Sequence, residues 1–153
     1  MIQRIQTIYL FLAFAICIGC LCTPIAHFMV NEGMGRTVDM YNLWLVEEGH
    51  HLFYYCPVMF GILAITTVLV FFDIWLYKHR ALQMRLAVFS MILLVAWYIA
   101  YGIISHMLCG EPGVTWRPHW TAALPAAAFI LLYLAFRGIL KDEMLVRSLD
   151  RLR

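Results

Sequence analysis

Histidine is the most suggestive reactive side chain in this 153-residue chain, because five of its six histidines fall near one predicted membrane face. Imidazole is the commonest protein ligand for transition metals, so several imidazoles at one face could hold zinc, copper or haem. No two of them have the i, i+4 spacing of ligands on one helix. We therefore expect interfacial side chains, with a metal or haem site as the alternative. The five are His27, His50, His51, His106 and His119.

The cysteines suggest thiol chemistry. Cys17 and Cys20 have the CxxC spacing of thiol oxidoreductases. An exchanging thiolate needs water and nearby positive charge, whereas this pair lies deep in an apolar run, so we expect two small packing residues and keep a thiol redox protein as an alternative. Cys56 and Cys109 fall near the predicted outer face, where an oxidising compartment could join them; the sequence leaves that pairing open.

Asp73 is the acidic residue nearest to the predicted membrane segments. An ionisable group inside a bilayer typically marks a proton or cation site. Lys78 and Arg80 follow closely, which is typical of a boundary residue near the headgroups, so we expect a boundary role and keep an ion pathway as the alternative. The chain has no Walker loop, GxSxG, HExxH or Rossmann glycine pattern. We predict no enzyme, and assign no catalytic, cofactor-binding or metal residue.

Composition indicates the elements that position these residues. Hydrophobic residues make up 64% of the chain and charged residues 13%, and the mean hydropathy is +0.82. A soluble fold could not bury that much apolar surface, and apolar segments in a bilayer must satisfy their own backbone as helices. We predict an all-α membrane protein in one domain, with a permanent first helix rather than a cleaved signal. The predicted spans are about 5–28, 55–77, 86–109 and 120–137, followed by a tail over 138–153.

Basic residues predict the orientation. The N-terminal tail, the second loop and the C-terminal tail carry most of the 11 Lys and Arg residues, whereas the first and third loops carry only Arg36 and Arg117. The positive-inside rule then places both termini in the cytoplasm. The first loop is acidic and contains aromatic residues, so we expect it outside, with those rings at the interface.

The spacing of small residues predicts where helices make contact, and the spacing of leucines predicts the structure of the C-terminal tail. Three pairs of small residues at i, i+4 could bring helices close: Ala15 with Gly19, Ala96 with Ala100, and Ala122 with Ala126. Pro24 should bend or end the first helix. In the tail, Leu145, Leu149 and Leu152 recur with helical spacing and predict an amphipathic basic helix. We expect this cytoplasmic helix to continue the fourth span and lie against acidic headgroups, with docking on a protein partner as the alternative.

Both ends of the chain resemble a known family. The opening residues 1–10, MIQRIQTIYL, and the closing residues 137–153, RGILKDEMLVRSLDRLR, are similar to an uncharacterised family of small four-helix membrane proteins from Gram-negative bacteria, catalogued as a domain of unknown function. The resemblance implies an inner-membrane location and no activity. Both motifs fall on the predicted cytoplasmic side, which suggests a shared surface formed by Gln3, Arg4, Gln6, Lys141, Asp142, Glu143, Arg147 and Arg151.

We therefore expect a multi-pass inner-membrane protein that acts as a non-enzymatic accessory or scaffold subunit of a membrane complex. Its partners would be the lipid bilayer and a membrane protein, or a second copy through self-association. The formal net charge of +2 gives no reason to expect nucleic acid. The alternatives are a redox or metal protein at the outer face and a small transporter or ion pathway through Asp73.

Overall fold

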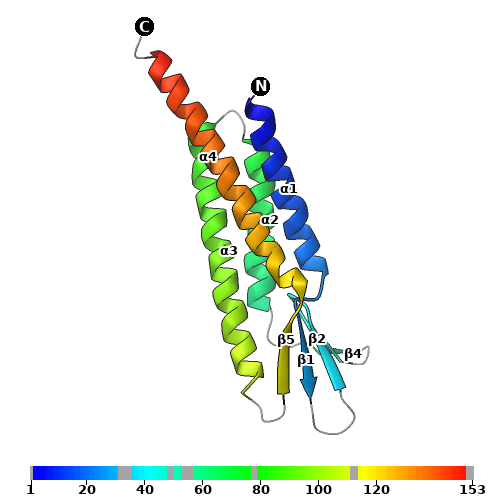
Figure 1. Ribbon diagram of the computed structural model, residues 1–153. Coiled ribbons are helices and arrows are strands. Elements are labelled where there is room, and N and C mark those ends of the chain that lie inside the picture. The colour runs from blue at the N-terminus through cyan, green and yellow to red at the C-terminus, as the bar shows by residue number, and fades with distance from the viewer. Residues whose placement is uncertain are drawn as a thin grey trace.

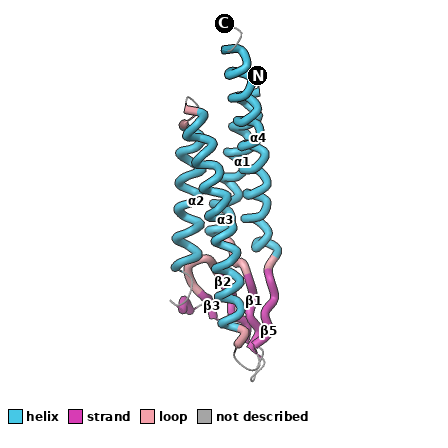
Figure 2. Tube along the Cα trace, turned by 90° about the vertical axis from the view of Figure 1, so that its left-hand side faces the viewer, coloured by secondary structure: helices cyan, strands magenta, loops and turns pink. Residues whose placement is uncertain are grey.

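The computed structural model describes residues 2–30, 36–47, 50–52, 57–76, 79–110 and 114–150. In this part of the chain, four long helices form a bundle and a small sheet lies at one end of it (Figures 1 and 2). The start of α1 and the end of α4 lie together at the opposite end, which we call the termini end; the other is the sheet end (Figure 1). The helices are α1 (Ile2–Cys22), α2 (Pro57–Trp75), α3 (Arg80–Leu108) and α4 (Leu124–Asp150), the last preceded by a 3-10 turn, η1 (Trp120–Ala123).

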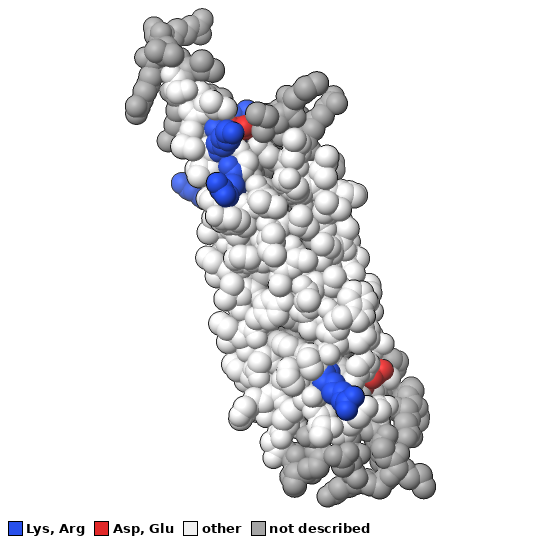
Figure 3. Space-filling view, viewed as in Figure 1, with Lys and Arg blue, Asp and Glu red and all other residues white. Residues whose placement is uncertain are grey.

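The surface of the bundle is apolar between its two ends. All four helices are long and apolar enough to cross a membrane. Large apolar side chains such as Phe11, Ile99 and Ile130 are more than half exposed. On the face shown in Figure 3, the described charged residues lie only toward the two ends. A water-soluble helix would place polar residues there, so this surface is compatible with a multi-pass membrane protein, and the number of long apolar helices is the one predicted.

The interior of the bundle is built from helical stripes. In α2 the buried positions run from Met59 through Leu63 and Val70 at intervals that keep them on one face, and in α3 they include Leu94 and Trp97. These residues form one cluster with buried residues of α1, α4 and the sheet, including Phe28. The sheet and the bundle therefore share a single core.

The sheet corrects the all-α prediction. Its strands are β1 (Ala26–Val30), β2 (Arg36–Met40), β3 (Leu45–Glu47), β4 (His50–Leu52) and β5 (Val114–Pro118). Every pairing is antiparallel, in the order β4-β3-β2-β1-β5. The first loop is therefore not only an interfacial segment, as predicted, but supplies strands that pack on the bundle. The short strands were hidden because β1 belongs to the same uncharged run as α1.

The first span is shorter than predicted. We expected a helix over about 5–28, but α1 ends at Cys22 and residues 26–30 form β1. Pro24 has no N–H and disfavours helical geometry in the residue before it, so the helix stops there, as the sequence predicted. His27 and Phe28 consequently lie in a strand, where alternate side chains point to opposite faces; Phe28 is buried and His27 is half-buried.

Of the other three helices, α3 departs most from its predicted bounds. Helix α3 begins at Arg80 rather than Leu86, so basic residues expected in a loop are helical. Helix α4 continues without a break to Asp150, which confirms that the tail extends the fourth span. In Figure 1 the last turns of α4 extend beyond the other three helices.

The predicted small-residue contacts are only partly used. Ala15 is exposed, and a Cβ added at Gly19 would meet nothing within 4 Å, so this pair makes no close helix contact in the chain. Ala100 and Ala122 pack against the core, whereas Ala126 is exposed. A close approach occurs instead at Gly138 of α4, where a Cβ would lie 2.8 Å from Gln6 Cγ of α1.

Candidate functional site

Four polar residues, one from each helix, lie at the termini end of the bundle. They are Gln6 of α1, Asp73 of α2, Gln83 of α3 and Asp142 of α4, and we call them the polar layer. Gln6, Asp73 and Gln83 are buried, and Asp142 is half-buried. Polar side chains buried among apolar helices need internal partners, so the hydrogen bonds of this layer determine what it can do.

One strong contact joins the two ends of the chain. Gln6 Nε2 donates a hydrogen bond of 2.8 Å to Asp142 Oδ2. Gly138 makes this geometry accessible, because any larger residue at that position would collide with the Gln6 side chain. The opening and closing motifs that carried the family resemblance are therefore in direct contact. Gln6 is 8% exposed, so it packs against α4 rather than belonging to the predicted exposed surface.

Two weaker contacts attach α3 to its neighbours. Gln83 Nε2 donates to the backbone carbonyl of Asp73 at 3.3 Å, and Arg80 Nη1 donates to the backbone carbonyl of Asp142 at 3.4 Å. Carbonyl groups in the last turn of a helix lack helical donors, so Gln83 supplies a donor where α2 is about to end. These contacts position the layer and involve no reactive atom.

The carboxyl group of Asp73 is the exception within the layer. It is fully buried, and neither of its oxygens has a hydrogen-bond partner among the described residues. We expected a boundary residue near the headgroups, but the side chain faces the interior of the bundle. The side chain of Lys78, its expected basic neighbour, lies outside the described residues. Burying a carboxyl group without partners lowers the stability of the fold. Asp73 is therefore the residue of the polar layer that is least explained by a structural role.

Four of the five described Lys and Arg side chains lie at the termini end of the bundle. Arg80, Arg85, Arg137 and Lys141 all belong to the adjoining turns of α3 and α4, and Figure 3 shows Lys and Arg grouped there. At the sheet end, Arg117 is the basic residue whose side chain is described. The remaining members of the predicted cytoplasmic surface, Gln3, Arg4, Arg147 and Arg151, have side chains outside the described set.

The structure brings together two of the five singled-out histidines. His27 Nδ1 lies 2.6 Å from Asp39 Oδ1, and the rings of His27 and His119 meet edge to face with centroids 5.0 Å apart. A carboxylate that fixes an imidazole is common behind metal ligands and general bases. However, no group of three or more His, Cys, Asp or Glu residues in the described ranges could hold a metal. His106 is exposed near the end of α3, and the side chains of His50 and His51 lie outside those ranges.

The hydroxyl group of Thr121, which lies beside His119, has a structural role. Thr121 Oγ1 lies 2.9 Å from His119 Nδ1 and donates a hydrogen bond to the carbonyl of Pro24. This contact ties the start of η1 to the segment between α1 and β1. In the described part of the chain, no serine or cysteine is hydrogen-bonded to a histidine, which is the arrangement that activates a nucleophile.

The cysteines of the CxxC pair are packing residues. Cys17 and Cys20 are fully buried in the common core and carry free thiols. This burial agrees with the packing role predicted for them, since thiol exchange needs an accessible sulfur. Cys109 is exposed with a free thiol, and Cys56, the residue whose pairing with it the sequence left open, lies outside the described residues.

Sequence reasoning missed Asn42. This fully buried side chain comes from the turn between β2 and β3 and enters the bundle. Its Nδ2 donates to the carbonyl of Cys20 at 2.6 Å, and its Oδ1 accepts from Trp97 Nε1 at 2.9 Å. Asn42 thus satisfies one of the last carbonyls of α1 and fixes a core indole of α3. No sequence pattern marks it, because polar residues are common in turns.

Comparison with known families gives one match. The family model described as Domain of unknown function (DUF4293) matches residues 2–152, nearly the whole chain. This confirms the resemblance to an uncharacterised family that the two terminal motifs suggested. No curated protein matches the sequence.

Proposed function

The chain belongs to the Domain of unknown function (DUF4293) family, and since that description names no activity, we propose its role from its geometry. We propose a non-enzymatic accessory or scaffold subunit of a membrane complex in the bacterial inner membrane. Its termini end would lie in the cytoplasm and bind a membrane-protein partner. The observation that carries this proposal is the free, partly apolar end of α4.

The turns of α4 around Asp142 offer a docking surface. Leu140, Met144 and Leu145 are 38%, 57% and 49% exposed, and Lys141 between them is also exposed. They flank Asp142, which contacts Gln6 of α1 and Arg80 at the start of α3, so this surface lies at the termini end of the bundle. The last turns of α4 extend beyond it (Figure 1). Apolar side chains exposed beside a basic one at that level are typical of an interaction surface.

Charge supports the proposed orientation. The described Lys and Arg residues concentrate at the termini end, and Arg117 lies at the sheet end. Under the positive-inside rule, the termini end faces the cytoplasm and the sheet faces the outside. Gln6 and Asp142 then hold α4 to α1 next to the docking surface, so the proposed docking helix leaves the bundle in a fixed direction.

The test is co-purification of the full-length chain from its native membrane in a mild detergent. We expect a stoichiometric membrane-protein partner, identified by mass spectrometry, that is lost from a Met144→Ser/Leu145→Ser double variant. The matched control is Trp75→Ser, which removes an apolar side chain that is 70% exposed near the same end, on α2. Partner loss in the α4 variant alone supports the proposal. Absence of a stoichiometric partner, or equal retention in all three proteins, overturns it.

A small ion pathway is the second candidate, and buried Asp73 is the observation that favours it. An acid inside a bundle that crosses a membrane is a functional hypothesis by default. Its test is a proton or cation flux measured on reconstituted vesicles. A flux abolished by Asp73→Asn but retained in Asp142→Asn would favour this function over the accessory role, and no measurable flux would reject it.

A further inference from the structure

A long groove runs between α3 and α4 on the outer surface of the bundle. Three adjoining cavities form it, with volumes of about 510, 370 and 260 Å³ from the termini end toward the sheet end. The first two share Val88 and Ile92, and the last two share Val95 and Phe129, so the three are continuous. We call this cavity series the α3–α4 groove.

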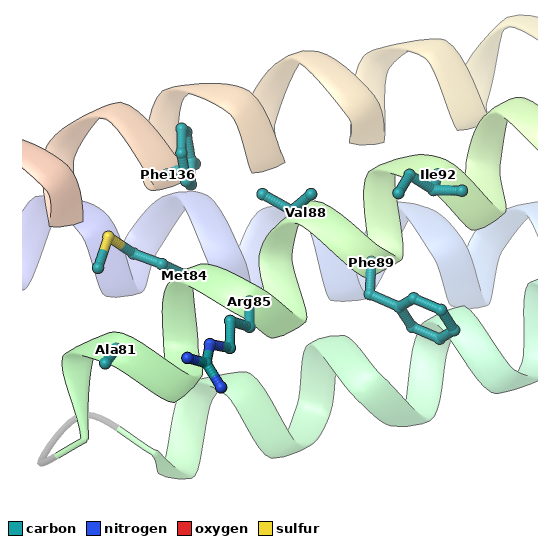
Figure 4. A pocket seen from close by; sticks show the side chains of 7 residues that line it. All are labelled: Ala81, Met84, Arg85, Val88, Phe89, Ile92 and Phe136. Carbon is teal, nitrogen blue, oxygen red and sulfur yellow. The ribbon is translucent and has the colours of Figure 1, made fainter.

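The groove is apolar along its length but has a charged end. Figure 4 shows Met84, Val88 and Ile92 of α3 along its wall, with Phe136 of α4 facing them. Arg85 is the charged residue among those lining it; its side chain leaves α3 on the side away from Phe136 and extends toward the end marked by Ala81 (Figure 4). A guanidinium group on an apolar stem is suited to reach the headgroup level from such a position.

Further positive charge lies at the same end. Arg137 and Lys141 are exposed on α4, in the turns that follow Phe136. With Arg85 they give three basic side chains at this end, beside two described acidic residues of α4, Asp142 and Glu143, and this positive excess makes the charged end of the groove complementary to an anion.

The dimensions match one leaflet of a bilayer. Arg85 and Val95 are ten residues apart on α3, and at a rise of about 1.5 Å per residue this stretch is about 15 Å long. That is half of a hydrocarbon core of about 30 Å. A headgroup held at Arg85 would therefore place its acyl chain along the first two cavities.

We propose that the α3–α4 groove binds an anionic phospholipid from the leaflet at the termini end, with its phosphate at Arg85 and its acyl chain against Val88, Ile92 and Val95. A second transmembrane helix fits this groove less well, because close helix packing needs small residues and this wall is built from valine, isoleucine and phenylalanine. A flexible acyl chain follows such a bulky wall without requiring close backbone approach. The binding depends on membrane insertion but not on the accessory role.

The test uses the full chain in lipid nanodiscs that contain equal amounts of phosphatidylglycerol and phosphatidylcholine. Native mass spectrometry after mild release counts the phospholipids that remain bound. We expect one retained phospholipid, mostly phosphatidylglycerol, and about a fivefold loss of that preference in Arg85→Gln, since one basic residue near an anionic surface contributes about that factor. Arg117→Gln at the sheet end is the matched control and should behave like the unmodified chain.

A second pair of variants tests the acyl-chain part of the groove. Ile92→Trp should fill the groove and reduce retention of both lipids, whereas Ile99→Trp, at an exposed position of α3 outside the groove lining, should not. Circular dichroism and gel filtration of each variant verify that it is folded. Equal retention of the two lipids, no effect of Arg85→Gln, or dimers cross-linked through Ile92→Cys would overturn the proposal, the last by placing a second copy in the groove.

Discussion

Gln6 and Asp142 are separated by 136 positions in the chain and joined by a hydrogen bond of 2.8 Å. Gly138, one helical turn before Asp142, leaves the space that the Gln6 side chain occupies. The three residues act as a unit. Gly138 has no side chain, which leaves room on α4 for the Gln6 side chain, and the Asp142 carboxylate one turn later accepts a hydrogen bond from the Gln6 amide. The contact fixes how α4 leaves the bundle at the termini end.

This unit predicts a coupled effect of two substitutions. Gly138→Ala should lower the free energy of unfolding by about 1–2 kcal/mol, because its Cβ would overlap Gln6 Cγ. In a Gln6→Ala background the same change should be neutral or stabilising, since alanine favours a helix over glycine by about 1 kcal/mol. Thermal or denaturant unfolding in detergent measures all four proteins. Equal effects of Gly138→Ala in both backgrounds would show that the two residues are not in contact.

Asn42 predicts a large loss of stability from a residue in a turn. Asn42→Ala would leave the carbonyl of Cys20 and the indole N–H of Trp97 buried without a partner, so we expect a loss of about 2–4 kcal/mol. Labelling of Cys20 by a small maleimide should also become faster, because the end of α1 is released. Thr115→Ala is the control: this exposed residue makes one long hydrogen bond of 3.4 Å, and its loss should have little effect. Similar stability of the two variants would contradict the capping role of Asn42.

Hydropathy was sufficient to predict the four long apolar helices but not the sheet at one end of the bundle. A membrane imposes one strong requirement, a long run of apolar residues, and each helix satisfies it independently of the others. Strand β1 escaped notice because its residues continue the apolar run of α1, although Pro24 marked the break. Pairing of β1 with β5 (Val114–Pro118) also joins segments far apart in the chain, because β5 follows the third helix.

For the candidate site, the sequence predicted only that the two terminal motifs would lie at the same end of the molecule. The terminal motifs were expected on the same side, and Gln6 and Asp142 lie there together. Their direct contact could not be predicted, because it depends on how α1 and α4 pack and on the space at Gly138. Burial of Asp73 was missed for a related reason: the last turn of a helix has both a surface face and an interior face, and only packing determines which one the acid occupies.

Asp73 predicts a gain of stability when its charge is removed. Its carboxyl oxygens make no hydrogen bond within the described part of the chain, so Asp73→Asn breaks no contact found there and should raise the free energy of unfolding by about 1 kcal/mol. Asp39→Asn is the matched control, because it weakens the pair with His27 and should lower that free energy instead. Denaturant unfolding in detergent distinguishes the two. A loss of stability in Asp73→Asn would reveal a partner of this carboxyl group.

The proposed orientation predicts which thiols a membrane-impermeant maleimide can reach. Cys109 is exposed at the sheet end, whereas Cys17 and Cys20 are buried, so a variant in which Cys22 and Cys56 are serine reports on Cys109 alone. We expect this variant to be labelled in spheroplasts of a bacterial host. Lys141→Cys in a further Cys109→Ser background places the reactive thiol at the termini end and should be labelled only after the membrane is permeabilised. Labelling of Lys141→Cys in intact spheroplasts, with Cys109 protected, would reverse the topology and place the positive end of α4 outside.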